Sequence, residues 1–152
     1  MNEITVRPAR RDEALTLATL VHGLIDELSG GKAPTITEMA AVAAPMLERG
    51  SICGLLAFDG DRPVGVLMLN ECAAIYAGGP FGEITELYVQ PDYRSKGVAR
   101  LLLSAAESLA AERGWKRLEV GAPDQPAWNR TLQFYLREGF SEVGPRLKKL
   151  TP

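Results

Sequence analysis

Residues 94–100, with the sequence RSKGVAR, are the segment best suited to chemistry. They follow a strand-like stretch at residues 84–89 and lead into a long helical pattern. The first backbone N–H groups of a helix have no partner inside it, and the helix dipole adds positive potential there. Gly97 would let a phosphate approach the backbone, Ala99 is small, and three basic side chains surround them. The segment therefore predicts an anion-binding turn; the alternative is a strand-to-helix turn whose glycine only relieves backbone strain.

The surrounding sequence alternates between strand-like and helix-like stretches that must position this turn. Apolar residues at helical spacing predict helices over residues 12–28, 39–48, from the turn to 114, and 128–138. Strands are predicted at residues 4–7, 52–58, 64–69, 83–89 and 116–120, with a last strand running from Phe140 toward Leu147. Thr35 with Glu38 fits a helix cap, and the sequence DGDR at residues 59–62 fits a hairpin turn.

The order β-α-α-β-β-β-α-β-α-β predicts an α/β (α+β) fold with a mixed central sheet of about six to seven strands. Both arms of the hairpin are mostly apolar, which predicts helices on both faces of the sheet. The length of 152 residues suits a single domain, residues 1–152. The helix after the turn should bury one stripe, formed by Leu101, Leu102, Ala105, Leu109 and Ala110.

Composition narrows the function classes. A net charge of −2 and a pI near 5.5 give no general reason to bind nucleic acid or an anionic membrane. The N-terminus lacks the apolar core of a signal peptide, so a cytoplasmic location is expected. Cys53 and Cys72 lie in apolar runs and are predicted to be buried free thiols. His22 is the only histidine, and an ordinary, partly exposed role is predicted for it; no metal site is expected.

Arg94, Gly97 and Ala99 fit the pattern [Q/R]-x-x-G-x-[G/A], and the longer stretch ELYVQPDYRSKGVARLLL resembles the Gcn5-related N-acetyltransferases (GNAT). The FYxxxGF pattern at residues 134–140 and the order of elements are similar to the same family over nearly the whole chain. The resemblance implies acetyl-CoA as co-substrate and direct acetyl transfer to a primary amine. A non-catalytic acyl-CoA sensor or interaction domain, or an acyltransferase that uses another acyl-CoA, would share these motifs.

The resemblance also implies which residues contact the cofactor. In the family, the strand before the turn pairs through its backbone with the pantetheine arm, by the logic of β-strand addition. The family's pantetheine-contacting Asn aligns with Trp128, and Asn129 is one position late, so either residue is a candidate. The implied set is Leu87, Tyr88, Val89, Arg94, Ser95, Lys96, Gly97, Val98, Ala99, Arg100, Trp128 and Asn129.

Two catalytic roles are implied. Tyr135 is expected to protonate the departing thiolate, a step typically worth roughly 10²–10⁴-fold; the alternative is a core tyrosine. Glu83 is expected to accept the proton of the amine, with Glu86 or water as alternatives. Strict strand alternation predicts Glu83 and Thr85 on the face of Leu87 and Val89, with Glu86 on the opposite face.

The acceptor is the least specified partner. Its pocket is expected between the first two helices, the loop at residues 29–34 and the stretch 71–81. A small-molecule amine and a peptide amine both remain open, and Glu27, Glu71 and Glu83 together would favour a cationic acceptor. No nucleic acid or membrane partner is expected, whereas homodimerisation is expected from the resemblance.

Overall fold

The computed structural model describes residues 3–122, 124–144 and 146–152, and the chain forms two compact units, Met1–Glu119 and Val120–Pro152. The strands are β1 (Ile4–Pro8), β2 (Ile52–Asp59), β3 (Arg62–Ala74), β4 (Gly79–Val89) and β5 (Leu118–Val120). The α-helices are α1 (Ala14–Ser29), α2 (Ile36–Met46), α3 (Val98–Arg113) and α4 (Asn129–Arg137). Two short 3-10 helices, η1 (Arg11–Glu13) and η2 (Pro91–Tyr93), precede α1 and α3.

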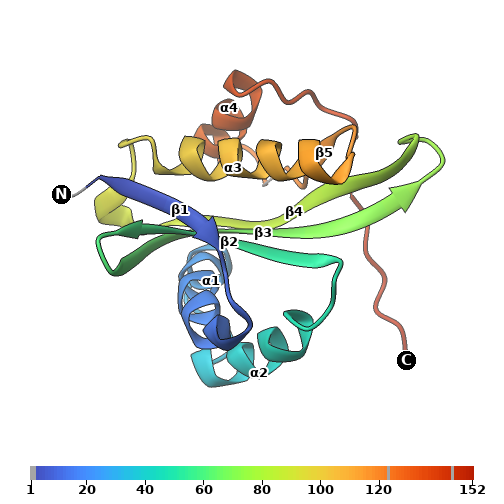
Figure 1. Cartoon of the computed structure of the whole chain (residues 1–152). Coiled ribbons are helices and arrows are strands. Elements are labelled where there is room, and N and C mark those ends of the chain that lie inside the picture. The colour runs from blue at the N-terminus through green and yellow to red at the C-terminus, as the bar shows by residue number, and fades with distance from the viewer. Residues whose placement is uncertain (1–2, 123, 145) are drawn as a thin grey trace. The chain divides into compact units, whose positions relative to one another are not determined.

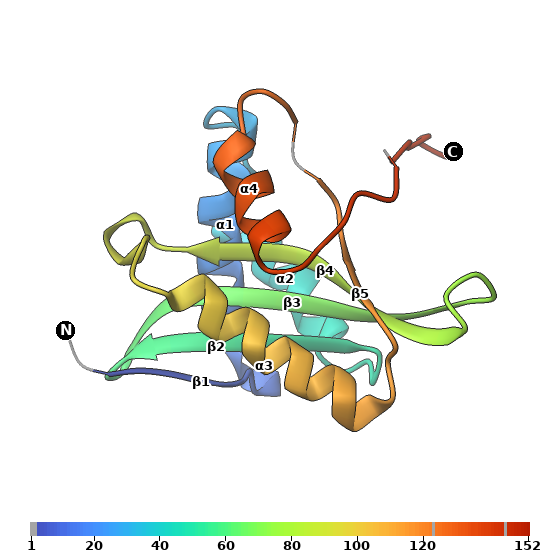
Figure 2. The same cartoon turned by 90° about the horizontal axis from the view of Figure 1, so that it is seen from above.

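The five strands form one sheet in the order β1-β2-β3-β4-β5. The first four pair antiparallel. Helices α1 and α2 lie on one face of this sheet and α3 lies on the other, as Figures 1 and 2 show. The predicted class, with helices on both faces of a central sheet, is therefore confirmed. Among the described residues, no helix combines the length and apolarity needed to cross a bilayer.

The side chains of β3 alternate between two apolar layers. Val66 and Met68 join Leu17 and Leu20 of α1 in one buried cluster. On the other face, a Cβ at Gly65 would lie 3.1 Å from Leu102 of α3. Even-numbered residues of β3 therefore face α1, and odd-numbered residues face α3. This assignment fixes the faces of β4 through its pairing with β3.

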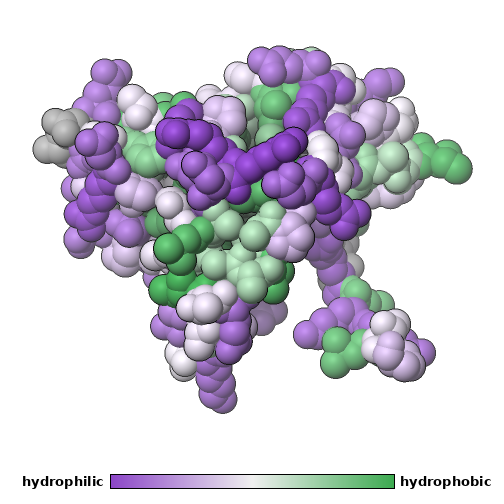
Figure 3. Space-filling view, turned by 60° about the horizontal axis from the view of Figure 1, so that its bottom comes forward, coloured by the Kyte–Doolittle hydropathy of each residue, from purple (hydrophilic) through white to green (hydrophobic). Residues whose placement is uncertain are grey.

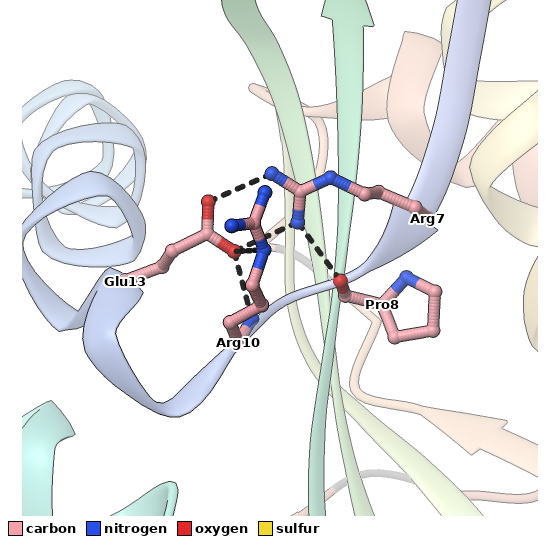
Figure 4. Close-up of polar contacts among 4 residues, drawn as sticks. All are labelled: Arg7, Pro8, Arg10 and Glu13. Atoms are coloured by element: carbon pink, nitrogen blue, oxygen red, sulfur yellow. Dashed lines mark hydrogen bonds and ion pairs between the residues drawn. The ribbon is translucent and has the colours of Figure 1, made fainter.

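Local sequence signals explain several element boundaries. The Thr35 hydroxyl accepts a hydrogen bond of 3.1 Å from the Glu38 N–H at the start of α2, which confirms the predicted cap. The hairpin turn between β2 and β3 is also confirmed, with Gly60 at φ +61°. At the end of β1, Arg7 donates to both carboxylate oxygens of Glu13 at 2.7 and 2.9 Å (Figure 4). This pair holds β1 against the start of α1.

Two predictions of the fold are wrong. The described residues after Phe140 form no strand, so the sheet has five strands rather than six or seven. Gly144 at φ +116° interrupts this stretch. The buried stripe of α3 also differs from the prediction, because apolar residues surround much of this helix; it consists of Val98, Leu102, Leu103, Ala106 and Ala110.

Candidate active site

The turn between β4 and α3 has the backbone of an exposed helix start. Gly97 is the N-cap of α3 with φ +82°, and Ser95 also has a positive φ of +61°. The N–H of Leu101 donates to the Gly97 carbonyl at 3.1 Å. The N–H groups of residues 98–100 therefore precede the first helical hydrogen bond. A Cβ at Gly97 would meet no other atom within 4 Å, which leaves room for an anion to approach the backbone.

Arg94 is anchored rather than mobile. Its Nε donates to the Val89 carbonyl at 2.9 Å, and its Nη2 donates to Glu27 of α1 at 2.7 Å. The guanidinium also lies 5.4 Å from the centre of the Tyr88 ring, at a distance typical of a cation–π contact. Burial and the neighbouring Glu27 raise the pKa of Tyr88. Arg94 thus connects the turn to the end of β4 and to α1, a pairing across 67 residues that no local pattern indicated.

The other basic residues of the turn are exposed at its surface. The Nζ atom of Lys96 lies 5.6 Å from the centre of the Tyr93 ring. Arg100 is exposed on the first turn of α3. The Tyr93 hydroxyl donates to Asp59 at 2.5 Å and so joins η2 to the β2–β3 hairpin. Basic side chains therefore lie near the N-terminal end of α3.

The edge of β4 away from β3 is only partly paired. β4 has 11 residues, whereas β5, its other neighbour, has 3. The Gly82 N–H donates to the Arg117 carbonyl at 3.1 Å, so β5 lies beside the first half of β4. Because three residues span only about 10 Å, β5 cannot cover the whole strand. Leu87 and Val89 pair with Leu67 and Gly65 on the β3 side.

A β-bulge in β4 changes which carboxylates share a face. Met68 pairs with Glu86 and the next residue, Leu69, pairs with Ile84, so the strand register skips Thr85, whose hydroxyl lies 3.5 Å from the Met68 carbonyl oxygen. Because Glu83 pairs with Asn70, both glutamates lie on the α1 face of the sheet. The predicted separation of Glu83 from Glu86 is therefore wrong. Strict alternation counts two residues per repeat, and the bulge inserts one more.

Glu86 lies on this face, half-buried and held by its neighbour. The Thr85 hydroxyl donates to Glu86 Oε1 at 2.6 Å.

The predicted trio of acceptor-binding glutamates is not assembled, since Glu27 binds Arg94 and Glu71 accepts a 2.6 Å hydrogen bond from the Trp115 indole. Local sequence could not reveal these partners, because both lie more than 40 positions away along the chain.

A cavity of 320 Å³ lies beneath α2 in the first unit. Residues of α1, α2, β3 and β4 line it, together with Pro34 of the loop between α1 and α2. Among the described residues that line it, Glu38 and Glu86 are the charged ones. Of the elements expected to form the acceptor pocket, the first two helices and Pro34 of the 29–34 loop line this cavity, whereas no described residue of the 71–81 stretch does.

Tyr135 belongs to the second unit, where it is buried with 6% of its surface exposed. Its ring packs edge-on against Phe134 and Phe140, with centroids 5.5 and 5.3 Å away. Burial raises the pKa of Tyr135 to about 12. The hydroxyl is therefore protonated at neutral pH, the state that a proton donor requires.

The two candidates for the pantetheine contact lie at the start of α4. Trp128 is the N-cap residue and is half-buried, and its carbonyl accepts from the N–H groups of Thr131 and Leu132 at 3.1 and 3.2 Å. Asn129 is the first helical residue and is exposed, and its Oδ1 accepts from Gln133 at 3.5 Å. A hydrogen-bonded turn precedes the helix, because the Trp128 N–H donates to the Asp124 carbonyl at 3.0 Å and the Asn129 N–H donates to the Pro126 carbonyl at 3.3 Å.

The remaining reactive side chains lie outside any cluster. Cys53 and Cys72 are free thiols, as predicted, but they are half-buried rather than buried. Both lie near a strand end, where neighbouring layers cover them less completely. His22 is half-buried on α1, as predicted. Within the described ranges, no three His, Cys, Asp or Glu side chains are grouped closely enough to hold a metal ion.

Comparison with known proteins identifies this combination of sheet, turn and helix. Residues 25–140 match the Acetyltransferase (GNAT) family. The chain belongs to this family. A relative among characterised proteins is the thialysine N-ε-acetyltransferase of Caenorhabditis elegans, which is 28% identical over 127 residues, covering 84% of this chain and 74% of that protein.

Solved GNAT structures share the fold. A GCN5-related N-acetyltransferase from Ralstonia eutropha JMP134 superposes with a TM-score of 0.77 at 22% identity, covering 97% of this chain and 99% of that one. A ribosomal-protein-alanine N-acetyltransferase from Brucella melitensis biovar Abortus 2308 gives a TM-score of 0.75 at 20% identity, with coverages of 97% and 100%. At these identities the likeness establishes the common fold of an acetyltransferase.

Proposed function

We propose that this GNAT protein transfers the acetyl group of acetyl-CoA directly to the primary amine of an acceptor. The observation that carries the proposal is the turn at Gly97. There a left-handed glycine, the N–H groups of residues 98–100 that precede the first helical hydrogen bond, and nearby basic side chains form a cradle suited to a pyrophosphate. The partly paired edge of β4 next to this turn offers backbone groups to the amides of the pantetheine arm.

In the proposed reaction, the ammonium group of the acceptor first loses a proton to Glu83, to Glu86 or to water. The amine lone pair then attacks the thioester carbonyl, the C–N bond forms and the C–S bond breaks. As the nitrogen becomes an amide it loses a second proton, Tyr135 donates a proton to the departing thiolate, and the tyrosine is reprotonated by the proton that the nitrogen released. The products are the acetylated amine, CoA thiol and the one proton first taken from the ammonium group. Holding the two substrates together contributes most of the rate enhancement.

The acceptor is proposed to be a small-molecule amine. The C. elegans relative is named for thialysine, a small amine, and the cavity beneath α2 has a volume within the usual range for small ligands. A peptide amine is the alternative that the same assay addresses. A thiol-release assay with acetyl-CoA and a panel of small amines and short peptides tests both acceptors. CoA binding without thiol release for any amine would instead indicate a non-catalytic acyl-CoA sensor.

A pair of matched glycine variants tests the turn itself. Gly97 and Gly114 cap the two ends of α3, both have a positive φ, and a Cβ at either position would meet no other atom within 4 Å. Gly97→Ala and Gly114→Ala should therefore strain the backbone equally, by about 1–2 kcal/mol each. Only Gly97→Ala is expected to weaken acetyl-CoA binding in calorimetry, by about tenfold or more. Equal affinities in the two variants would refute the proposed pyrophosphate site.

A further inference from the structure

The cavity beneath α2 has walls of two different kinds. Leu17 and Val21 of α1, Met39 and Met46 of α2, and Met68 of β3 are among its nine apolar lining residues. The other two lining residues are Glu38 and Glu86, and no lining residue is basic. A volume of 320 Å³ lies at the lower end of the range for small-molecule sites. The walls therefore suit a compact ligand that is apolar over most of its surface.

Helix α2 supports the view that a ligand completes this region. Its sequence, ITEMAAVAAPM, is mostly apolar, yet none of its residues is buried, and Val42 is 64% exposed. An apolar helix normally buries its apolar side against the core. Figure 3, seen from the side of α1 and α2, shows hydrophobic surface on this face with hydrophilic surface around it. The apolar side chains of α2 are therefore half-buried or exposed, and a bound ligand could cover them further.

The charged residues of the cavity walls set a second requirement for the ligand. Glu86 projects from the sheet, with its carboxylate held by the Thr85 hydroxyl at 2.6 Å. Glu38 lies on the first turn of α2, where its N–H is bound to Thr35. Two carboxylates on different walls, without a lining cation, attract an ammonium group and repel a ligand carboxylate. A zwitterionic amino acid would place its own carboxylate in this acidic, apolar space.

We propose that the acceptor is an amphipathic primary amine, with a compact aryl or alkyl body and no carboxylate, bound in the cavity beneath α2. This inference rests on the proposed acetyltransferase function and specifies its substrate class. The apolar body would pack against α1 and α2, and the ammonium group would bind between the carboxylates. The acceptor class therefore differs from thialysine, for which the C. elegans relative is named.

The test uses the full chain, acetyl-CoA and four acceptors: 2-phenylethylamine, hexylamine, thialysine and a short lysine-containing peptide. We expect kcat/KM for 2-phenylethylamine and hexylamine to exceed that for thialysine and the peptide by about tenfold or more. Equal or greater values for thialysine or the peptide would overturn the inference while leaving the acetyltransferase function intact. Absence of thiol release with every amine would count against the proposed function instead.

Two variants and a matched control locate the binding site. Glu38→Gln should raise KM for 2-phenylethylamine by about threefold to fivefold with little change in kcat, as expected for the loss of one partly exposed charge contact. Glu107→Gln makes the same charge change on an exposed position of α3, on the other face of the sheet, and should leave KM unchanged. An unchanged KM in Glu38→Gln would contradict the proposed site.

Ala43→Leu fills part of the cavity from α2. It should raise KM for 2-phenylethylamine at least threefold while keeping or increasing the melting temperature, since filling a cavity adds contacts. Calorimetric titration of 2-phenylethylamine into the CoA-bound protein supplies a readout that does not require turnover. Binding that Ala43→Leu leaves unaltered would refute the location, even if the protein proved inactive.

Discussion

The packing of Gly82 against Trp115 offers a sharp test of the first unit, because sequence and structure predict opposite signs. Glycine inside a strand is less favourable than alanine by about 0.5–1 kcal/mol, so Gly82→Ala should be stabilising on local grounds alone. In the structure, however, a Cβ at Gly82 would lie 2.5 Å from Cε3 and Cζ3 of Trp115 and 2.9 Å from Cδ2 of Leu118. Carbon atoms in contact are usually about 3.5–4.0 Å apart.

The indole has little freedom to move away. Trp115 is 6% exposed, and its Nε1 donates to Glu71 at 2.6 Å. Forcing a methyl group into such a site typically costs about 1–3 kcal/mol, which exceeds the local gain. We therefore expect Gly82→Ala to lower the free energy of unfolding by about 1–2 kcal/mol.

Urea unfolding followed by circular dichroism measures this change. With a slope of about 1–3 kcal/mol/M, the midpoint should fall by roughly 0.3–2 M. Gly50→Ala is the matched control, because a Cβ there would meet no atom within 4 Å and its φ lies outside the left-handed region. It should leave the midpoint unchanged or slightly higher. A Gly82→Ala variant as stable as the parent would refute the packing argument.

Two further predictions concern titratable groups. Tyr135→Phe should lower kcat by roughly 10²-fold or more with CoA affinity nearly unchanged, and unchanged turnover would remove Tyr135 from its proposed role. Because the pKa of Tyr135 is raised to about 12, ionisation of this group should not reduce turnover below about pH 11. The hydrogen bonds from Arg7 lower the pKa of Glu13 from 4.5 to about 2, so its stabilisation is complete above pH 4.5 and disappears as the pH falls toward 2. The free energy of unfolding should therefore fall less for Glu13→Gln than for the parent between pH 6 and pH 3, by on the order of 2 kcal/mol. Urea unfolding at the two pH values measures the difference, and equal decreases in the two proteins would contradict the stabilising role of the ionised Glu13.

Local chemistry explains which parts of the fold could be predicted from sequence. The cap at Thr35, the hairpin turn at Gly60 and the helix start at Gly97 each depend on residues within a few positions of one another. Side-chain oxygen at an N-cap and glycine in a left-handed turn are direct physical requirements of these conformations. Such features were predicted correctly because the residue that causes each one lies inside it.

Long-range features were missed for the corresponding reason. The Arg94–Glu27 pair joins residues far apart in sequence, and the apolar pattern of α2 is the same whether the helix covers a packed core or a cavity. Helix α3 has apolar residues on several sides, so its sequence does not define which side is buried. Packing against the sheet buries Val98 and Leu103 rather than Leu101 and Leu109. Only the assembled layers decide these cases.

The bulge at Thr85 shows how one unpaired residue can determine the chemistry of a strand. With strict alternation, Glu83 would face α3 and Glu86 alone would face α1. Because Thr85 is left out of the pairing, both carboxylates lie on the α1 face, and the Thr85 hydroxyl is directed to Glu86. Glu86 and the cavity beneath α2 are thus on the same side of the sheet as Glu83, the other candidate base. A proton acceptor and a site for a cationic amine can therefore occupy one face, whereas the Gly97 turn at the end of β4 remains available for the donor.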